Sequence, residues 1–319
     1  MPDTGMEMTS DSIGRVLPRR VLGRSGQQVT MLGLGGFHVG WTTEPLAQAV
    51  IEAALEEGIR FFDTAESYGD GTSEQRYGKF LVPKYRGNVF LMTKTTAKDA
   101  ATARTHLEGS LRRLGVDVID LWQMHALESP EDVDARIKAG VLDVLLEARA
   151  SGKVKYLGFT GHGSPYAHQR MLERFGADGP FTAMQMPVNP VDAGSPHSFV
   201  HSVIPKATQN GMGVLAMKTL ADGRFFQVKK VNGKVTWETD NPVVPGRLTA
   251  CECLGFAWSL PVSVLITGAE NPEFVREKAA ICRQFARMDE EQRQILVRRV
   301  VEFAREGRVE YYKNEALRK

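Results

Sequence analysis

The chain has 319 residues, which fits two average domains or one closed barrel, and its 42% hydrophobic and 24% charged residues are typical of a globular enzyme. Acidic and basic residues are mixed with a formal net charge of +2, so no basic face indicates nucleic-acid binding, and no apolar run reaches membrane-spanning length. The 3 cysteines argue against a disulfide framework, and Cys251 and Cys253 have no His or Cys partners at zinc-ligand spacing, so we expect a metal-free protein in a reducing compartment, the cytoplasm.

The N-terminal end of the chain differs in composition from the rest. Its first residues are mostly small and polar, and we expect residues 1–17 to form a disordered tail. Alternating residues around Arg24-Ser25-Gly26 predict a short N-terminal hairpin. No linker or low-complexity stretch divides the remainder of the chain, so residues 18–319 are expected to form a single domain.

Apolar runs and helical periodicities alternate through the first half of the chain. The predicted strands cover Val29–Leu34, Ile59–Phe62, Val89–Met92 and Val118–Met124. The predicted helices cover Pro45–Glu57, a segment from Thr72, a segment through Leu107–Leu114 that ends at Gly115, and Val133–Arg149. Thr72 and Gln75 have the spacing of a capping box, which indicates the start of the second of these helices.

The second half repeats the alternation. Strands are predicted over Val154–Phe159, Thr182–Met186, Val214–Met217 and Val262–Ile266. Helices are predicted over Tyr166–Arg174, His197–Gln209, Arg247–Trp258 and Pro272–Ala286. About eight strand–helix units predict an α/β fold, the (β/α)8 or TIM barrel, and Glu290–Glu306 adds an extra C-terminal helix.

One long connection interrupts this rhythm. Asp222–Gly246 follows the Val214–Met217 strand, and within it residues alternate on both sides of Asn232-Gly233, which is a strong hairpin signal. The connection leaves the carboxyl ends of the strands, where barrel enzymes keep their active sites. Two interpretations stay open: a cover for the active site, or a surface flap that touches no ligand.

Four polar side chains follow apolar strands at positions that would share one mouth of the barrel. Asp63 ends the strand of residues 60–63, and Tyr68 lies on the loop after it. Lys94 ends the next strand, and His125 ends the one after that. Because the carboxyl ends of barrel strands converge, we expect these side chains to form a candidate catalytic set.

Two segments resemble signatures of the aldo-keto reductase superfamily. Residues 58–69 read Gly-Ile-Arg-Phe-Phe-Asp-Thr-Ala-Glu-Ser-Tyr-Gly, and residues 110–125 read Ser-Leu-Arg-Arg-Leu-Gly-Val-Asp-Val-Ile-Asp-Leu-Trp-Gln-Met-His. The resemblance extends from about Val21 to Lys278. It implies reduction of a small carbonyl substrate to an alcohol with NADP(H) or NAD(H), by a catalytic set made of Asp63, Tyr68, Lys94 and His125.

Carbonyl reduction explains why these four residue types would act together. Reduction needs a hydride and a proton, and Tyr68 would donate the proton as general acid. Lys94 would lower the pKa of that phenol, and Asp63 would hold Lys94 in place. His125 would donate a hydrogen bond to the carbonyl oxygen.

The resemblance also implies residues for the nicotinamide end of the cofactor. Gly36-Phe37 matches the loop beside the nicotinamide, and Thr160 and Gln185 match residues that bind the carboxamide. Met217 stands where many members stack an aromatic ring. His162, two residues beyond Thr160, is either a substrate contact or a loop histidine bonded to the backbone.

Other positions match the pyrophosphate and adenosine end. Lys218 and Leu220 match the stretch along the pyrophosphate, and Gly268-Ala269 and Glu277 match the adenosine site. Glu270 stands where a cationic or amide side chain often meets the 2′-phosphate of NADP, so this position favours NADPH less than in most members.

Two functions from different classes remain in view. The first is an NAD(P)H-dependent carbonyl reductase. The second, also implied by the resemblance, is a cofactor-binding, redox-sensing regulatory subunit that turns over slowly. The oligomeric state is not predicted. Several aromatic residues suggest an apolar substrate pocket: Phe37, His38, Trp41, Phe225 and Trp237.

Overall fold

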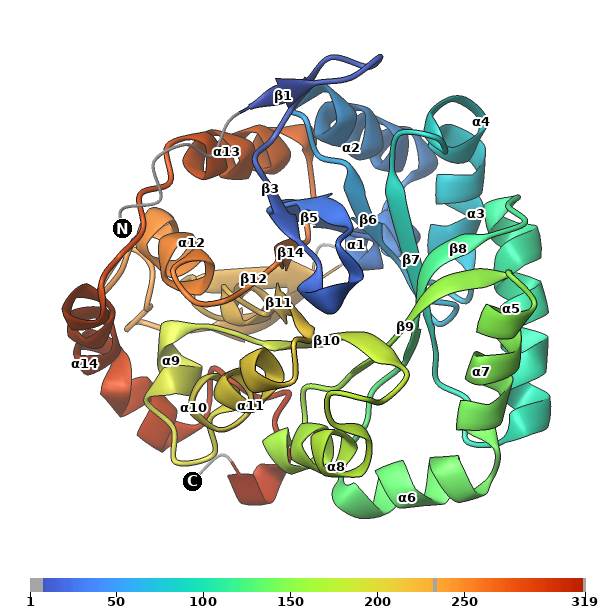
Figure 1. The fold of residues 1–319 in the computed structure, drawn as a ribbon. Helices are drawn as coiled ribbons and strands as arrows, with labels where there is room; N and C mark the ends of the chain where they lie inside the picture. The colour runs from blue at the N-terminus through green and yellow to red at the C-terminus, as the bar shows by residue number, and fades with distance from the viewer. Residues whose placement is uncertain (1–7, 232–233, 318–319) are drawn as a thin grey trace.

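The structure is a computed structural model, and it describes residues 8–231 and 234–317. Eight parallel strands close into a barrel in the order β10-β11-β14-β5-β6-β7-β8-β9 (Figure 1). The barrel strands are β5 (Leu32–Gly35), β6 (Phe61–Asp63), β7 (Phe90–Thr95), β8 (Ile119–Met124), β9 (Val154–Thr160), β10 (Phe181–Pro187), β11 (Gly213–Met217) and β14 (Val264–Thr267). The predicted (β/α)8 architecture is therefore confirmed.

Helices surround the strands and connect each one to the next (Figure 1). They are α1 (Phe37–Trp41), α2 (Glu44–Glu56), α3 (Thr72–Phe80), α4 (Val82–Tyr85), α5 (Ala100–Leu114), α6 (Pro130–Lys138), α7 (Val141–Ala150), α8 (Pro165–Phe175), α9 (Pro190–Ala193), α10 (Phe199–Ser202), α11 (Ile204–Gln209), α12 (Ala250–Trp258), α13 (Pro272–Arg283) and α14 (Glu290–Glu306). The C-terminal helix α14 has the predicted bounds.

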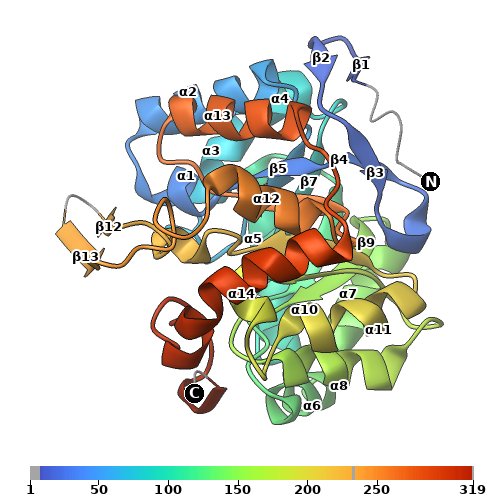
Figure 2. The ribbon, with the colours of Figure 1, turned by 90° about the vertical axis from the view of Figure 1, so that its left-hand side faces the viewer.

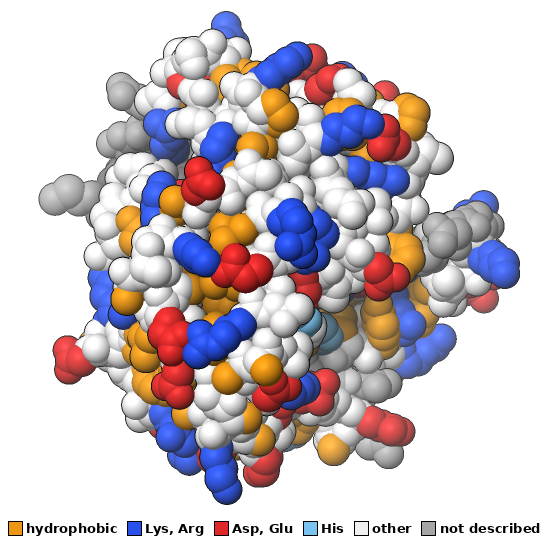
Figure 3. Space-filling view, turned by 90° about the vertical axis from the view of Figure 1, so that its right-hand side faces the viewer, with side chains coloured by type: hydrophobic (Ala, Val, Ile, Leu, Met, Phe, Trp, Pro, Cys, Tyr) orange, Lys and Arg blue, Asp and Glu red, His pale blue; other side chains and the backbone are white. Residues whose placement is uncertain are grey.

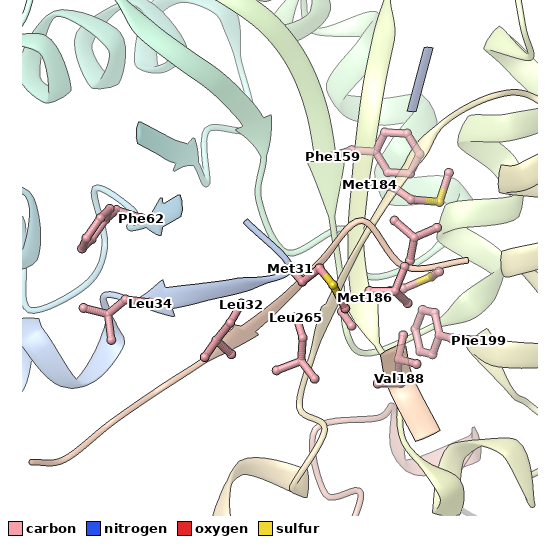
Figure 4. Close-up of a cluster of buried hydrophobic side chains, with 14 of the residues drawn as sticks. Met31, Leu32, Leu34, Phe62, Phe159, Met184, Met186, Val188, Phe199 and Leu265 are labelled. Carbon is pink, nitrogen blue, oxygen red and sulfur yellow. The ribbon is translucent and has the colours of Figure 1, made fainter. Parts of the chain in front are cut away.

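The strands pack apolar side chains on both faces, as a closed parallel barrel requires. The side chains that fill the barrel form one cluster: Leu22, Val29, Phe61, Phe90, Met92, Leu121, Ala183, Leu215, Val264 and Ile266. A second, larger cluster lies between strands and helices, and Figure 4 shows part of it, where Met186 and Val188 lie near Phe199 of α10. Alternation between the two clusters fixes which residue of each strand points inward.

Local sequence located the start of α3 at Thr72 correctly, but it missed one helix break and predicted one cap that does not form. The helix predicted over Val133–Arg149 is two helices, α6 and α7, because Gly140 adopts φ = 80° between them. The capping box predicted at Thr72 is absent, since the N-cap of α3 is Gly71 and makes no side-chain cap. A capping box does begin α12, where Thr249 and Glu252 bond reciprocally.

The N-terminal segment is ordered from residue 8, where a disordered tail was expected over 1–17; residues 1–7 lie outside the described residues. Two short antiparallel strands, β1 (Thr9–Ser10) and β2 (Arg15–Val16), form a hairpin. Asp11 accepts two bonds, at 2.7 and 2.9 Å, from the buried guanidinium of Arg60, and Leu17 is fully buried. Asp11 therefore ties this segment to the barrel at the start of β6.

Two further hairpins lie at opposite ends of the barrel (Figure 2). The predicted N-terminal hairpin is β3 (Arg19–Val21) paired with β4 (Gln28–Thr30). The long connection after β11 carries β12 (Val228–Val231) and β13 (Lys234–Glu238), which project outward beyond the carboxyl ends of the barrel strands. Asn232-Gly233, the predicted turn, lies outside the described residues.

Two features are absent from residues 8–231 and 234–317: a membrane-spanning helix and a cluster of metal-ligating side chains. No helix there is both long and apolar enough to cross a bilayer, and no cluster of His, Cys, Asp and Glu is arranged to hold a metal ion. On the face in Figure 3, acidic and basic side chains are interspersed.

Candidate active site

Three adjacent strands bring the predicted catalytic residues to one mouth of the barrel. Asp63 is the last residue of β6, Lys94 lies near the end of β7, and His125 follows β8 directly. Phe61 and Met92, two residues before Asp63 and Lys94, belong to the cluster inside the barrel. Because side chains alternate along a strand, Asp63 and Lys94 also point inward.

Asp63 and Tyr68 meet around the Lys94 ammonium, and His125 lies beside Tyr68. Lys94 Nζ lies 2.5 Å from Asp63 Oδ1, 2.8 Å from the carbonyl oxygen of Thr64 and 3.2 Å from Tyr68 Oη. The rings of Tyr68 and His125 meet edge to face, with centroids 5.7 Å apart. The residues predicted from strand ends are thus neighbours in space, and Asp63 and Lys94 are buried whereas Tyr68 and His125 are partly exposed.

Tyr68 is held by the loop that follows β6. Thr64 Oγ1 donates to Ser73 Oγ at 2.7 Å, and Ser73 Oγ donates to the carbonyl of Gly36 at 2.8 Å. These bonds join the loop to α3 and to the end of β5. A side chain at Gly40 would meet the Tyr68 carbonyl at 2.9 Å, so only glycine allows α1 to pack this closely on the loop.

The environment sets the charge of each group. Burial lowers the pKa of Lys94, but Asp63 and Tyr68 beside it more than offset this effect and leave that pKa raised, so the ammonium stays charged. Burial, followed by the Lys94 charge, holds the pKa of His125 well below 6.5, so its imidazole is neutral.

The expected lowering of the Tyr68 pKa is not the net result. Burial raises the pKa of the phenol above 10.0, and the charge of Lys94 only opposes this effect. Sequence spacing predicts the nearby cation but not the desolvation of the phenol, which depends on how the mouth is packed. Tyr68 therefore holds its proton throughout the neutral range.

The residues predicted for the nicotinamide end lie on the next strands around the barrel. Thr160 ends β9, Gln185 lies in β10 and Met217 ends β11. The side-chain oxygen of Gln185 is buried and has no hydrogen-bond donor in the described parts of the chain. A buried acceptor without a donor is costly unless a ligand supplies one.

Lys218 and Leu220 lie directly beyond β11. Lys218 has a left-handed backbone (φ = 55°), and its Nζ lies 3.1 Å from Asp222 Oδ1. Between them, the buried hydroxyl of Thr219 has no hydrogen-bond partner among residues 8–231 and 234–317. Thr219 was not predicted from sequence, because a lone threonine in a loop carries no distinguishing pattern.

The predicted adenosine positions lie on the loop and helix after β14. His38 packs so closely on Gly268 that a side chain at Gly268 would meet its Nδ1 at 2.4 Å. Lys278 Nζ donates to the Gly268 carbonyl at 2.6 Å, and burial lowers the pKa of Lys278 to about 8. Glu270 Oε1 lies 3.8 Å from His38 Nε2, while Ala269 is buried and Glu277 is exposed.

The expected aromatic pocket is present only in part. Phe37 meets Tyr68 edge to face at 5.5 Å, and Phe37 and Trp41 are about half exposed. Phe225 is fully buried in the core, and Trp237 packs on Arg224. Phe37, at the start of α1, is thus the expected pocket residue whose ring contacts Tyr68.

Known proteins share both the sequence pattern and the fold. A sequence model of the Aldo/keto reductase family matches residues 31–296. The chain belongs to this family. It is 30% identical over 234 residues to aldo-keto reductase YhdN of Bacillus subtilis (strain 168), a match that covers 68% of this chain and 66% of that protein's length.

Solved structures of aldo-keto reductases have the same fold at lower identity. The holo form of AKR11C1 from Bacillus halodurans superposes with a TM-score of 0.73 at 23% identity, covering 89% of this chain and 96% of that chain. An aldo-keto reductase from Klebsiella pneumoniae in complex with NADPH superposes with a TM-score of 0.66 at 22% identity, covering 88% and 95%.

Proposed function

We propose that this protein is an NAD(P)H-dependent reductase of aldehydes or ketones, with Tyr68 as the general acid. The observation that carries the proposal is the chain of contacts from Asp63 through Lys94 to Tyr68, with neutral His125 beside the phenol. Family membership supports oxidoreduction in general, and these contacts support the finer assignment.

The residues at the barrel mouth fit a nicotinamide cofactor. The buried oxygen of Gln185 needs a donor, and a carboxamide has an N–H₂ group to offer. Thr160 on the adjacent strand would bind the same amide, with Gly36, Phe37 and Met217 near the ring. The related Klebsiella protein was solved with NADPH, which supports the same cofactor class here.

Other predicted positions would hold the rest of the cofactor. Lys218 and Leu220 would bind the pyrophosphate, and the hydroxyl of Thr219 is free to donate to it. Gly268, Ala269, Glu270 and Glu277 would surround the adenosine. When bound, the cofactor supplies the hydride for reduction.

Side chains of the protein would bind the carbonyl oxygen of the substrate and protonate it. Neutral His125 donates a hydrogen bond that orients the carbonyl and stabilises charge developing on its oxygen. Tyr68 donates the proton, and its raised pKa keeps that proton in place until the alkoxide forms. Lys94, 3.2 Å from Tyr68 Oη, stabilises the phenolate left behind, and Asp63 keeps the ammonium oriented.

Titration with NADPH and NADH, followed by turnover of a panel of aldehydes and ketones, tests the proposal. We expect binding of at least one cofactor and its carbonyl-dependent oxidation. Tight cofactor binding without turnover of any carbonyl would instead indicate the redox-sensing regulatory subunit.

A further inference from the structure

The loop that carries Tyr68 is anchored on two sides, and one anchor involves a residue outside the predicted catalytic set. On the first side, hydrogen bonds through Ser73 join the loop to α3 and to the end of β5. On the second side, Glu66 Oε1 accepts hydrogen bonds from the backbone N–H of Thr96 at 2.7 Å and from Thr96 Oγ1 at 2.5 Å. Glu66 therefore connects the loop after β6 to the loop after β7.

This connection joins the same two segments as the contact between Tyr68 and Lys94. Glu66 lies two residues before Tyr68, and Thr96 lies two residues beyond Lys94 on the other segment. Lys94 Nζ lies 3.2 Å from Tyr68 Oη and 2.8 Å from the carbonyl oxygen of Thr64. A movement of the Tyr68 loop away from β7 would therefore have to break the bonds of Glu66 as well as those of Lys94.

The backbone that follows Tyr68 explains why the loop needs anchors on both sides. Residues 69–71 all have positive φ, at 60°, 52° and 90°, and the middle one is Asp70. A left-handed backbone costs free energy for a residue with a side chain, so contacts made elsewhere in the structure must hold this turn. Ser73 is bonded on the far side of the turn, and Glu66 is bonded before Tyr68.

The buried carboxylate of Glu66 makes its contacts through one oxygen. The Nδ1 atom of His106 on α5 lies 3.3 Å from Oε1 and 2.9 Å from Thr95 Oγ1. The other oxygen, Oε2, is buried and has no hydrogen-bond partner in the part of the chain that the structure describes. A charged acceptor makes a stronger hydrogen bond than a neutral one, so Oε1 holds the Thr96 donors more firmly than an amide oxygen would.

We propose that Glu66 is a positioning residue that keeps Tyr68 within hydrogen-bonding distance of Lys94 by tying the loop after β6 to Thr96. In this role Glu66 touches no reacting atom and acts only through Tyr68. Cofactor and substrate binding depend on other groups, so the anchor should affect the proton-transfer step and neither binding step. This inference rests on the proposed reductase function.

Glu66→Ala tests the assignment, because it removes both hydrogen bonds to Thr96. We expect kcat for any carbonyl that the wild type reduces to fall about tenfold, since a displacement of about 1 Å can cost about 100-fold in rate. KM for that carbonyl and the NADPH dissociation constant should stay within about twofold. Glu66→Gln keeps an acceptor in place of Oε1, so it should bring kcat to within about threefold of the wild-type value.

Two further variants separate positioning from a general loosening of the fold. Glu74→Gln is the matched control, because Glu74 also accepts from a β7 threonine, Thr93 Oγ1 at 2.6 Å, but lies on α3 and pairs with Arg113. This control should lower the urea midpoint, since it removes a buried charge partner, yet leave kcat near the wild-type value. In a Tyr68→Phe background, adding Glu66→Ala should change the residual kcat by less than about twofold, because the group that it positions is gone.

Several results would overturn the inference. Unchanged kcat in folded Glu66→Ala would mean that the bonds through Ser73 alone hold Tyr68, and if that variant does not fold, unchanged kcat in Thr96→Val, which lacks only the hydroxyl donor, would mean the same. A loss carried by KM or by weaker NADPH binding, or a full further loss in the Tyr68→Phe background, would show that Glu66 does not act through Tyr68. A wild type that turns over no carbonyl of the panel would instead refute the reductase function, which is a different failure.

Discussion

Replacing Tyr68 with phenylalanine removes the proposed acid and little else. The ring keeps its edge contacts with Phe37 and His125, whose centroids lie 5.5 and 5.7 Å away. Lys94 loses a bond of 3.2 Å but keeps those to Asp63 and the Thr64 carbonyl, so the free energy of unfolding should fall by only about 1 kcal/mol. We expect kcat to fall at least about 100-fold, a rise in the barrier of about 2.7 kcal/mol.

The assay is steady-state kcat with both substrates saturating, alongside a fluorescence titration of NADPH. The cofactor dissociation constant should barely change, because Tyr68 is proposed to act on the substrate oxygen. A folded variant that retains near-normal kcat would refute the role of Tyr68.

The pH profile gives an independent test of the same group. Burial raises the pKa of Tyr68 above its ordinary 10.0, so the phenol is the populated form at all lower pH values. The rate of reduction should therefore stay level through neutral pH and fall only above about pH 10. The reverse reaction, oxidation of the alcohol, needs the Tyr68 phenolate, so its rate should rise as the pH rises above about 10. A fall in reduction near pH 7 that disappears in Tyr68→Phe would contradict this assignment.

The remaining predictions concern the ion pair, the cofactor end and the hairpin. Lys94→Met should lower the free energy of unfolding, measured in urea, by about 3–5 kcal/mol, because it leaves the buried Asp63 carboxylate unpaired. The double variant Lys94→Met/Asp63→Asn should regain this stability but not kcat. A double variant as unstable as Lys94→Met alone would contradict this prediction. Glu270→Arg should shift the ratio of kcat/KM for NADPH over NADH about tenfold toward NADPH, since it replaces a carboxylate that repels the 2′-phosphate with a charged hydrogen-bond donor. A wild type that already prefers NADPH more than about 1000-fold would mean that Glu270 faces away from that phosphate. Deleting residues 228–237 with a short Gly-Ser link should raise KM or speed cofactor release without unfolding the protein, because Val228 and Val235 are exposed; unchanged kinetics would make the hairpin a surface flap.

Periodicity predicted the barrel well because each strand and helix is specified by its own residues. Short apolar runs between helical segments located all eight strands, and strand ends located Asp63, Lys94 and His125. The positions that failed depend on distant partners. Thr72 has capping-box spacing and α3 does begin there, but Gly71 is the N-cap and no side-chain cap forms, while Ser73 is bonded to the Gly36 carbonyl 37 residues away.

Order at the N-terminus has the same explanation. Residues 8–17 look like a polar tail in isolation, but Asp11 is bonded to Arg60, 49 residues further along the chain. Gly140 shows the limit of periodicity in another way. The apolar spacing continues through it, so the sequence resembles one helix, although the left-handed backbone of Gly140 divides it in two.

The sequence predicted which side chains form the site, but not the net direction in which the pKa of Tyr68 shifts. Sequence identified the cation beside Tyr68, yet the sign of the pKa shift depends on burial, which only the packed mouth reveals. The contacts of His38 with Gly268 and of the His162 ring with Tyr312 likewise join segments that are far apart in the sequence.

Carbonyl-dependent oxidation of NADPH or NADH by the purified wild-type protein is the most direct test of the central claim. The assay measures loss of the reduced cofactor with and without each carbonyl of the panel, after binding of that cofactor has been shown. We expect oxidation that depends on the carbonyl and yields the alcohol in equal amount. Saturable cofactor binding with no carbonyl-dependent oxidation across the panel would contradict the claim.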